Sequence, residues 1–402
     1  MRLLLSQARR AVACVSVMAW VSVAAAQASV APTPAIPWPA ELRDAVLRHG
    51  PWPPPPASDA GNAMSGRPAA IALGQQLFFD ARLSPSGRVA CASCHVPALA
   101  FADGRPRSVG LQPVDRHAPS LWNAVHERWM GWGGAADSLW AQSLQALLDP
   151  REMAGHAAHV RQLIAGDATL ACRFRAATGQ EPGALEPESA MVQAAKAIGA
   201  FVATLVSPRT PFDDFRDALA QQDAAAMARY PRDAQRGLQL FVGRGQCALC
   251  HGGPRFTNGE FADTGLPFFS RPGVVDAGRH AGIETLKASP YNRLSRWAEG
   301  ADATATRHVQ LQPRNFGEFK VPGLRHVAQT GPYMHDGQLA TLPDVLRHYS
   351  ELNEERLHAD GERILRPLKL SEGEMADLRA FLGTLSPDGG LRWQPVAMGA
   401  CR

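Results

Sequence analysis

Two short runs of cysteine and histidine could do chemistry in this 402-residue sequence. The first is Cys91-Ala-Ser-Cys94-His95 and the second is Cys247-Ala-Leu-Cys250-His251. In each run the two-residue spacer places both thiols on one edge of a haem, where they form thioether bonds to its vinyl groups. The adjacent histidine then reaches the iron. The pattern predicts two covalently bound haem c groups, with His95 and His251 as iron ligands.

Other sites built on paired cysteines fit the sequence less well. A zinc ribbon places its second pair about 15–20 residues after the first, whereas these motifs begin at Cys91 and Cys247. A thioredoxin-like site lies in an alternating strand–helix pattern, and strand signals are sparse here. The preceding segments also match, since Gly74-Gln-Gln-Leu77-Phe78 leads into one motif and Gly237-Leu-Gln-Leu240-Phe241 into the other. We therefore expect a repeated unit in which a helix feeds a haem-attachment loop.

The repeat and the composition together indicate the fold class. Glycine and proline are frequent, at 36 and 32 residues, and Ile71, Leu73, Leu77 and Phe78 have helical spacing, so ordered structure is expected to start near Ala69. Ala-rich residues 187–206 predict a long helix, and residues 208–233 a polar connector. We expect an all-α protein of two cytochrome c-like domains with long loops and little strand. The expected segments are a signal peptide at 1–26, a Pro-rich lead-in at 27–66, a first haem domain at 67–217, a second haem domain at 218–390 and a C-terminal tail at 391–402.

The N-terminus is typical of a secretory signal. Arg2, Arg9 and Arg10 precede an apolar stretch at 11–25, and Ala24-Ala25-Ala26 is a small-residue cleavage site. The stretch is short for a membrane span, so we favour cleavage over a retained anchor. We expect a periplasmic protein with no membrane span after cleavage. The formal net charge of +4, without a basic run, argues against nucleic-acid binding.

Two cysteines remain outside the signal and the haem motifs, namely Cys172 and Cys401. Exported proteins form disulfides readily, so this pair could be joined. Nothing in the sequence brings the two residues together, and their pairing stays open at this point.

Several longer motifs resemble those of the bacterial di-haem cytochrome c peroxidases and their MauG-type relatives, over roughly residues 70 to 390. They stand in the family's order. The motifs are Arg116-His-Ala-Pro119-Ser-Leu-Trp-Asn123, Gly131-Trp132-Gly-Gly134-Ala-Ala-Asp137-Ser-Leu-Trp-Ala-Gln142, Leu148-Asp-Pro-Arg-Glu152-Met153, Phe319-Lys-Val-Pro-Gly-Leu-Arg325-His and Thr330-Gly-Pro-Tyr-Met-His335-Asp-Gly337.

The resemblance implies that the first haem reacts with hydrogen peroxide in a pocket that contains Gln142 and Glu152. A partly buried carboxylate can move a proton between the two peroxide oxygens, and an amide can hold peroxide by hydrogen bonds. Trp132 matches the tryptophan that lies between the two haems and relays an electron or hole. Its structural alternative is a core aromatic residue, and the two interpretations are compatible.

One departure from the peroxidases concerns the first haem. Classical members place a histidine ligand in the loop after the first motif, where this chain has Ser108-Val-Gly110-Leu111. Leu111 cannot bind iron, so the resemblance implies a first haem with an open position. The neighbouring His117 is a substitute ligand to consider.

A second departure concerns the other haem. The peroxidases carry a methionine ligand fourteen residues after the motif histidine His335, and MauG-type enzymes carry a tyrosine there; this chain has Tyr349. Leu342, Leu346 and Tyr349 share one helical face. Rival ligands are Met334 and His348, and a core tyrosine is the structural alternative. A phenolate is a hard anion that favours Fe(III) and Fe(IV), so the resemblance implies that peroxide forms a high-valent bis-Fe(IV)-type state.

The implied function is oxidation of a partner protein's residues, tryptophan among them, by long-range electron transfer. The motif wording is most similar to the MbnH branch, whose enzymes act on a copper-binding partner protein. One alternative is a conventional cytochrome c peroxidase fed by a small cytochrome c or cupredoxin, and another is a di-haem electron carrier. The family also binds calcium through carbonyl oxygens, here those of Thr330 and Pro332, although His117 stands at the usual asparagine ligand.

Overall fold

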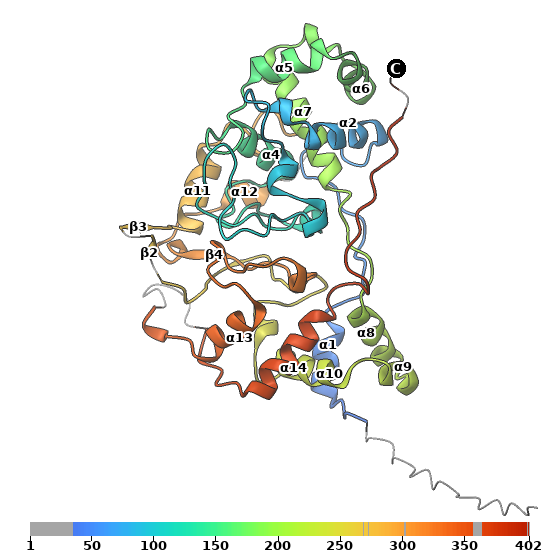
Figure 1. Cartoon of the computed structure of the whole chain (residues 1–402), viewed down its shortest axis with the longest axis vertical. Coiled ribbons are helices and arrows are strands. Elements are labelled where there is room, and N and C mark those ends of the chain that lie inside the picture. The colour runs from blue at the N-terminus through green and yellow to red at the C-terminus, as the bar shows by residue number, and fades with distance from the viewer. Residues whose placement is uncertain are drawn as a thin grey trace, which may run out of the picture. The chain divides into compact units, whose positions relative to one another are not determined.

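The computed structural model describes residues 35–267, 269–271, 273–300, 303–356, 364–399 and 401, and the expected signal peptide lies outside them (Figure 1). The expectation of a mostly helical fold with little strand is confirmed. The helices are α1 (Ala40–Leu47), α2 (Pro68–Phe79), α3 (Cys91–Cys94), α4 (Leu139–Leu148), α5 (Ala157–Gly166), α6 (Ala168–Thr178), α7 (Pro187–Val202), α8 (Pro211–Gln221), α9 (Ala224–Ala228), α10 (Arg232–Val242), α11 (Arg279–Ala288), α12 (Thr304–His308), α13 (Leu342–Ser350) and α14 (Glu372–Gly383).

Strands are short and pair in twos within the described residues. Strand β1 (Phe261–Asp263) runs antiparallel to β4 (Glu318–Lys320), with Ala262 opposite Phe319. Strand β2 (Phe269–Arg271) pairs with β3 (Val274–Val275), also antiparallel. The first pair thus joins two segments that are distant in the sequence, whereas the second is a local hairpin.

The first hydrophobic cluster is built from residues between Met64 and Leu205, on α2, α4, α5, α6 and α7. The Ala-rich helix α7 lies at its centre, and small side chains let its neighbours approach closely. At the crossing of α2 and α7, a Cβ on Gly74 would lie only 1.8 Å from the Ala197 carbonyl oxygen. Glycine is therefore required at position 74 by the helix packing.

The second hydrophobic cluster contains Val46 and residues between Phe212 and Leu385. Its main pair of helices is α10 and α14. Here a Cβ on Gly237 would lie 2.0 Å from the Asp377 carbonyl oxygen. Gly74 and Gly237 hold the same place in the repeated motifs, so the repeat encodes one close helix crossing in each cluster.

Two expectations about irregular segments were wrong. Ordered structure begins before Ala69, because α1 inserts Val46 into the second cluster and Trp52 is buried, with its indole donating to the Ser207 carbonyl oxygen at 2.9 Å. Residues 208–233 are not a simple connector, since they form α8 and α9. Helix α8 is stable here because its apolar face, with Phe212 and Phe215, is buried.

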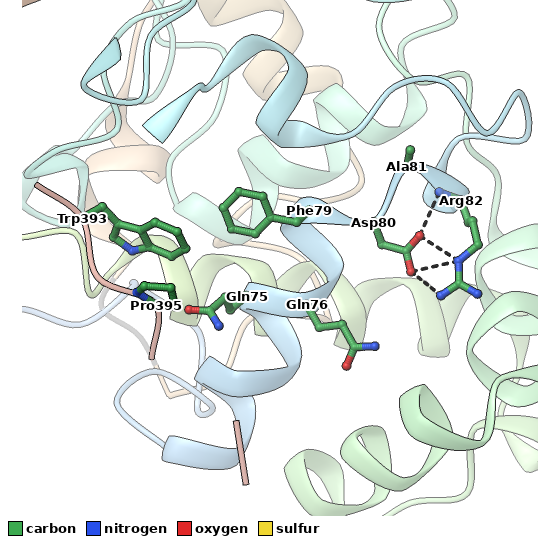
Figure 2. Close-up of a pocket in the computed structure, with 8 residues that line it drawn as sticks. All are labelled: Gln75, Gln76, Phe79, Asp80, Ala81, Arg82, Trp393 and Pro395. Atoms are coloured by element: carbon green, nitrogen blue, oxygen red, sulfur yellow. Dashed lines mark hydrogen bonds and ion pairs between the residues drawn. The ribbon is translucent and has the colours of Figure 1, made fainter. Parts of the chain in front are cut away.

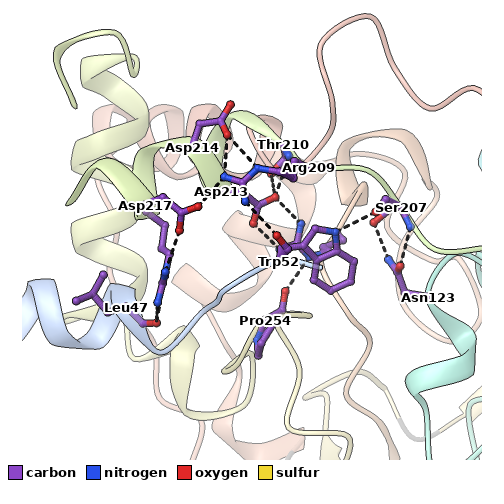
Figure 3. A network of polar contacts seen from close by, with 12 residues as sticks. Leu47, Trp52, Asn123, Ser207, Arg209, Thr210, Asp213, Asp214, Asp217 and Pro254 are labelled. Carbon is purple, nitrogen blue, oxygen red and sulfur yellow. Dashed lines mark hydrogen bonds and ion pairs between the residues drawn. The ribbon is translucent and has the colours of Figure 1, made fainter. Parts of the chain in front are cut away.

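A buried ion pair joins α8 to the loop after β4, and Figure 3 shows its carboxylate, Asp213, near Trp52 and Pro254. Arg325 donates to both carboxylate oxygens of Asp213, and both side chains are 2% exposed. Arg325 also donates to the Pro254 carbonyl oxygen at 2.7 Å, and its guanidinium lies 3.7 Å from the ring centre of Trp52. The two buried charges thus neutralise each other and have further hydrogen-bond and aromatic partners, as buried charges require.

The C-terminal tail runs back from α14 to α2 and α6 (Figure 1). Val396 donates to the Gln75 side chain at 2.7 Å, and the Gln75 amide donates back to the Val396 carbonyl oxygen at 3.3 Å. Beyond it, Cys401 forms a disulfide with Cys172 on α6, which settles the pairing that the sequence left open. Among the described helices, none has the length and apolar character to cross a membrane.

Candidate active site

The two motif histidines are held in the same way. The His95 Nδ1 donates to the Phe101 carbonyl oxygen at 2.9 Å, and the His251 Nδ1 donates to that of Phe256 at 3.0 Å. Burial lowers the pKa of both imidazoles, which keeps them neutral. A neutral ring whose Nδ1–H is occupied leaves Nε2 as the iron ligand. The donor chemistry therefore fits a haem at each motif.

The loop after the first motif packs on the backbone of Glu152. Leu111 donates its N–H to the Glu152 carbonyl oxygen at 3.0 Å. A Cβ on Gly110 would lie 2.6 Å from the Glu152 Cα, so the two chains touch. The residue that cannot bind iron is thus placed directly beside the residue expected to handle protons.

Gln142 lies on α4, whose first turn is capped by Ser138. Its Oε1 is fully buried and accepts no hydrogen bond within the described chain. A Cβ on Gly131 would come within 3.5 Å of that oxygen, which locates it against the loop that carries Trp132. Because buried polar atoms are almost always satisfied, this oxygen is suited to accept from a bound ligand.

The Glu152 carboxyl group is partly buried near the first motif. Burial raises its pKa, and repulsion from Asp149 raises it further. The thiols of Cys91 and Cys94 have pKa values raised by burial first, with a further contribution from the charge of Glu152. The carboxyl group therefore lies close to the haem-attachment residues and holds its proton more firmly than an exposed glutamate.

Trp132 is hydrogen-bonded to two segments that are distant in the sequence, one at His117 and one at Lys320. Its indole donates to the His117 carbonyl oxygen at 2.8 Å, and its own carbonyl oxygen accepts from Lys320 on β4 at 2.8 Å. His117 in turn donates its backbone N–H to the His335 carbonyl oxygen at 2.8 Å. The tryptophan is therefore fixed between the segment of His117 and strand β4, and His117 links it further to the segment of His335.

One nitrogen of the buried His117 ring has a backbone partner. Its Nδ1 donates to the Arg105 carbonyl oxygen at 2.7 Å, and the ring is buried. Thr330 and Pro332 lie together in one turn, with a cis bond between Gly331 and Pro332. In the part of the chain that the structure describes, no group of three or more His, Cys, Asp or Glu side chains could hold a metal ion. Calcium at the carbonyl oxygens of Thr330 and Pro332 stays a prediction.

Tyr349 lies on α13 next to the second motif. Burial is the main cause that raises the pKa of its phenol, and the nearby thiols of Cys247 and Cys250 raise it further. The ring therefore lies beside that motif. His348 is directed away, because its Nε2 donates to the Thr264 carbonyl oxygen at 2.8 Å. Of the two neighbours, only Tyr349 is thus positioned toward the second motif.

Sequence reasoning missed the residues that support the histidines. The carbonyl groups of Phe101 and Phe256 fix the two rings, and both phenylalanines are fully buried. His49, from the lead-in, lies 3.2 Å from the His251 carbonyl oxygen through its Nε2. A buried phenylalanine five or six residues after each motif was the available signal for the first two; His49 had none.

Comparison with known proteins identifies the family. Residues 68–221 match the family described as di-haem cytochrome c peroxidase. A methylamine utilization protein MauG from Methylorubrum extorquens is 38% identical over 323 residues, covering 80% of this chain and 79% of the relative. A cytochrome-c peroxidase, IdrP1, from Denitromonas iodatirespirans is 35% identical over 351 residues, covering 84% and 86%.

Solved structures give the same result. A MauG-like protein associated with microbial copper homeostasis has a TM-score of 0.65 and 28% identity, covering 84% of this chain and 95% of that chain. The diheme peroxidase BthA from Burkholderia thailandensis also has a TM-score of 0.65, covering 84% and 91%. At 22% identity, the second likeness concerns the fold alone.

Proposed function

Since the chain belongs to the di-haem cytochrome c peroxidase and MauG family, we propose that it uses hydrogen peroxide to oxidise side chains of a partner protein. The haems, when bound, supply the redox chemistry that splits the O–O bond. The reaction takes up two electrons and two protons for each peroxide, which becomes two water molecules. The protein's own residues have to hold the peroxide, move the protons and provide a route for the electrons.

The observation that carries the proposal is the difference between Leu111 and Tyr349. Leu111 offers no donor atom at the first motif and is held against Glu152. Tyr349 offers a phenol oxygen at the second motif, where its neighbour His348 is bonded elsewhere. A haem held at the first motif would gain no ligand from Leu111 and could meet peroxide, whereas a haem held at the second motif could be bound by Tyr349 and could hold an oxidising equivalent.

Gln142 and Glu152 supply the polar groups of the first site. The unpartnered Oε1 of Gln142 can accept a hydrogen bond from a peroxide O–H. The raised pKa of Glu152 lets its carboxyl group take a proton from one peroxide oxygen and return it to the other. Acid–base help of this kind is worth roughly 10²–10⁴-fold in rate.

Trp132 supplies the connection between the sites in this proposal. Its indole N–H donates to the His117 carbonyl oxygen, and the His117 backbone N–H donates to the His335 carbonyl oxygen. An indole fixed in this way can pass an electron without rearranging. The long-range character of the reaction, with the partner oxidised at the surface, rests on such a relay.

The partner is proposed to be an exported protein, and a copper-binding one is favoured. The support is the likeness to a MauG-like protein associated with microbial copper homeostasis. The second candidate function is that of a conventional peroxidase, supplied by a small cytochrome c or cupredoxin. The likeness to IdrP1, a cytochrome-c peroxidase, favours it. A plain di-haem carrier is the third reading, and it requires both irons to be six-coordinate.

Electron paramagnetic resonance of the resting ferric protein tests the proposal. We expect one high-spin signal from the His95 haem and one low-spin signal from the His251 haem. Two low-spin signals would exclude an open first iron and restore the carrier or the conventional peroxidase. The partner is then tested by adding peroxide and a purified, exported copper-binding protein. Oxidised tryptophan in that protein's peptides supports the proposal, and unmodified peptides oppose it.

A further inference from the structure

The C-terminal tail brings a tryptophan to the first haem site. The His95 Nδ1 donates to the Phe101 carbonyl oxygen at 2.9 Å. The Phe101 ring meets the Trp393 indole at a near right angle, with ring centres 5.7 Å apart. Phe79 and Phe201 pack around the same indole at 5.2 Å and 6.1 Å. A continuous packed path therefore leads from the expected iron ligand to Trp393.

Trp393 also reaches the surface. It is partly exposed and lines a shallow pocket with Phe79 and Pro395 (Figure 2). The Phe79 side chain is itself 39% exposed. A second tryptophan, Trp122, touches the Phe101 ring at 5.9 Å, but its indole N–H is buried without a hydrogen-bond partner. Of the two, Trp393 is the one that lines this surface pocket, which places its indole to exchange a proton with solvent.

The tail is fastened on both sides of the indole. Leu391 donates to the Gln329 side chain at 3.4 Å before it, and Val396 and Gln75 exchange two hydrogen bonds after it. The disulfide between Cys172 and Cys401 closes the end of the tail. A segment without regular structure is thereby held in one place, which keeps Trp393 against Phe101.

We propose that Trp393 is a surface redox residue, at which electrons from a protein donor enter the first haem domain. This rests on the peroxide chemistry of the proposed function. In each relay event Trp393 loses one electron to the haem domain and its indole proton to solvent. It is restored by one electron and one proton from an oxidisable side chain of the donor. Two events reduce one peroxide to two water molecules.

The route is separate from Trp132. The Trp132 indole is bonded to the His117 carbonyl oxygen. The path to Trp393 instead starts at the His95 Nδ1–H and passes through the carbonyl group and ring of Phe101. Phenylalanine is not oxidised at potentials that oxidise indole, so Phe101 serves as the medium through which the electron tunnels. Trp393 is the readily oxidised side chain on this path that lines a surface pocket.

The test uses the holoprotein without a partner. Peroxide is added in the presence of a nitroso spin trap, and tryptic peptides are searched for the adduct by mass spectrometry. The lifetime of the peroxide-oxidised haem spectrum is followed in parallel for Trp393→Phe, the conservative Trp393→Tyr and the control Trp297→Phe. Trp297 is also partly exposed, and the Arg296 guanidinium lies 4.5 Å from its ring centre.

We expect the adduct on Trp393, a longer-lived oxidised spectrum in Trp393→Phe, a lifetime near wild type in Trp393→Tyr and no change in Trp297→Phe. A spectrum that responds to peroxide, with no adduct on Trp393 or an unchanged lifetime in Trp393→Phe, overturns this inference and leaves the proposed function standing. A haem spectrum that does not respond to peroxide overturns both. Unchanged haem absorption before peroxide confirms that each variant has folded.

Discussion

The backbone N–H of Leu111 donates to the carbonyl oxygen of Glu152, so the residue that cannot bind iron is joined through its main chain to the residue expected to move protons. A histidine at position 111 would present an imidazole in the same loop. We expect Leu111→His to turn the first ferric haem from high-spin to low-spin and to slow its reaction with peroxide. Electron paramagnetic resonance measures the spin state, and stopped-flow absorption measures the rate of the peroxide reaction.

Leu111→Asn is the matched control for that experiment. It adds polarity and hydrogen-bonding capacity at the same position, but an amide is a poor ligand for haem iron. The high-spin signal should persist in this variant. A low-spin signal in both variants would show that loop disturbance, and not an imidazole ligand, changes the iron.

Tyr349 is expected to bind the iron of the second haem. Tyr349→Phe removes the phenol oxygen and keeps the aromatic ring at the same position of α13. The low-spin ferric signal of the second haem should change, and the near-infrared mixed-valence absorption of the peroxide-treated protein should disappear. His348→Gln is the control, because His348 donates to the Thr264 carbonyl oxygen and an amide can do the same. Loss of the low-spin signal only in His348→Gln would reverse the assignment.

Glu152 is expected to carry the proton between the peroxide oxygens. Glu152→Gln keeps the shape of the side chain and removes its acid–base function, so the peroxide reaction should slow by roughly 10²–10⁴-fold. Asp115→Asn, at an exposed carboxylate that binds Arg151, is the control and should keep the wild-type rate. A wild-type rate in Glu152→Gln would remove this residue from the mechanism. Stopped-flow absorption after peroxide addition provides the rates.

The sequence was most informative where chemistry is local. Two cysteines and a histidine within five residues predict a haem motif wherever the chain folds, and the spacing of Leu342, Leu346 and Tyr349 predicts the face of α13. Helix α8 had readable signals too, namely proline at its first position and Phe212 and Phe215 three residues apart. Its acidic and basic side chains concealed the apolar stripe.

The segments that were missed depend on tertiary contacts. The Pro-rich lead-in has no periodic pattern, yet Trp52 is buried because Arg325 and the Ser207 carbonyl group meet it from distant parts of the chain. The tail likewise has no helical or strand pattern around Trp393. Its place is set by Gln75 and by a disulfide that spans 229 residues. Such partners cannot be paired from one sequence.

The repeated glycines give a stability prediction. An alanine Cβ at Gly74 or Gly237 would collide with the carbonyl group of the facing helix. Forcing extra volume into a packed interface costs about 1–3 kcal/mol, so Gly74→Ala and Gly237→Ala should each lower the free energy of unfolding by at least that amount. Denaturant unfolding followed by circular dichroism gives the value.

Gly373→Ala is the control for the glycine variants. Gly373 lies in the first turn of α14 with no atom within 4 Å of the added Cβ. Alanine is the better helix former by about 1 kcal/mol, so this variant should be neutral or more stable. Equal losses in all three variants would mean that the crossings are not the cause.

Asp59 links stability to pH through the helix that carries Gln142. Its carboxylate accepts from the backbone N–H groups of Leu139 and Trp140 at 2.7 Å and 3.1 Å, at the start of α4. Burial is the largest influence and raises its pKa to about 6 from the ordinary 3.8. Between these values the folded protein keeps a proton that the unfolded chain releases, so acid favours the folded state.

The stabilisation from that proton is complete below pH 3.8 and is lost as the pH rises through about 6. A shift of roughly two pKa units corresponds to about 3 kcal/mol. The stability of wild type relative to Asp59→Asn should therefore fall by about that much between pH 4 and pH 7. Denaturant midpoints at several pH values provide the test, and a constant difference for Asp59→Asn would show that this carboxyl group does not titrate with folding.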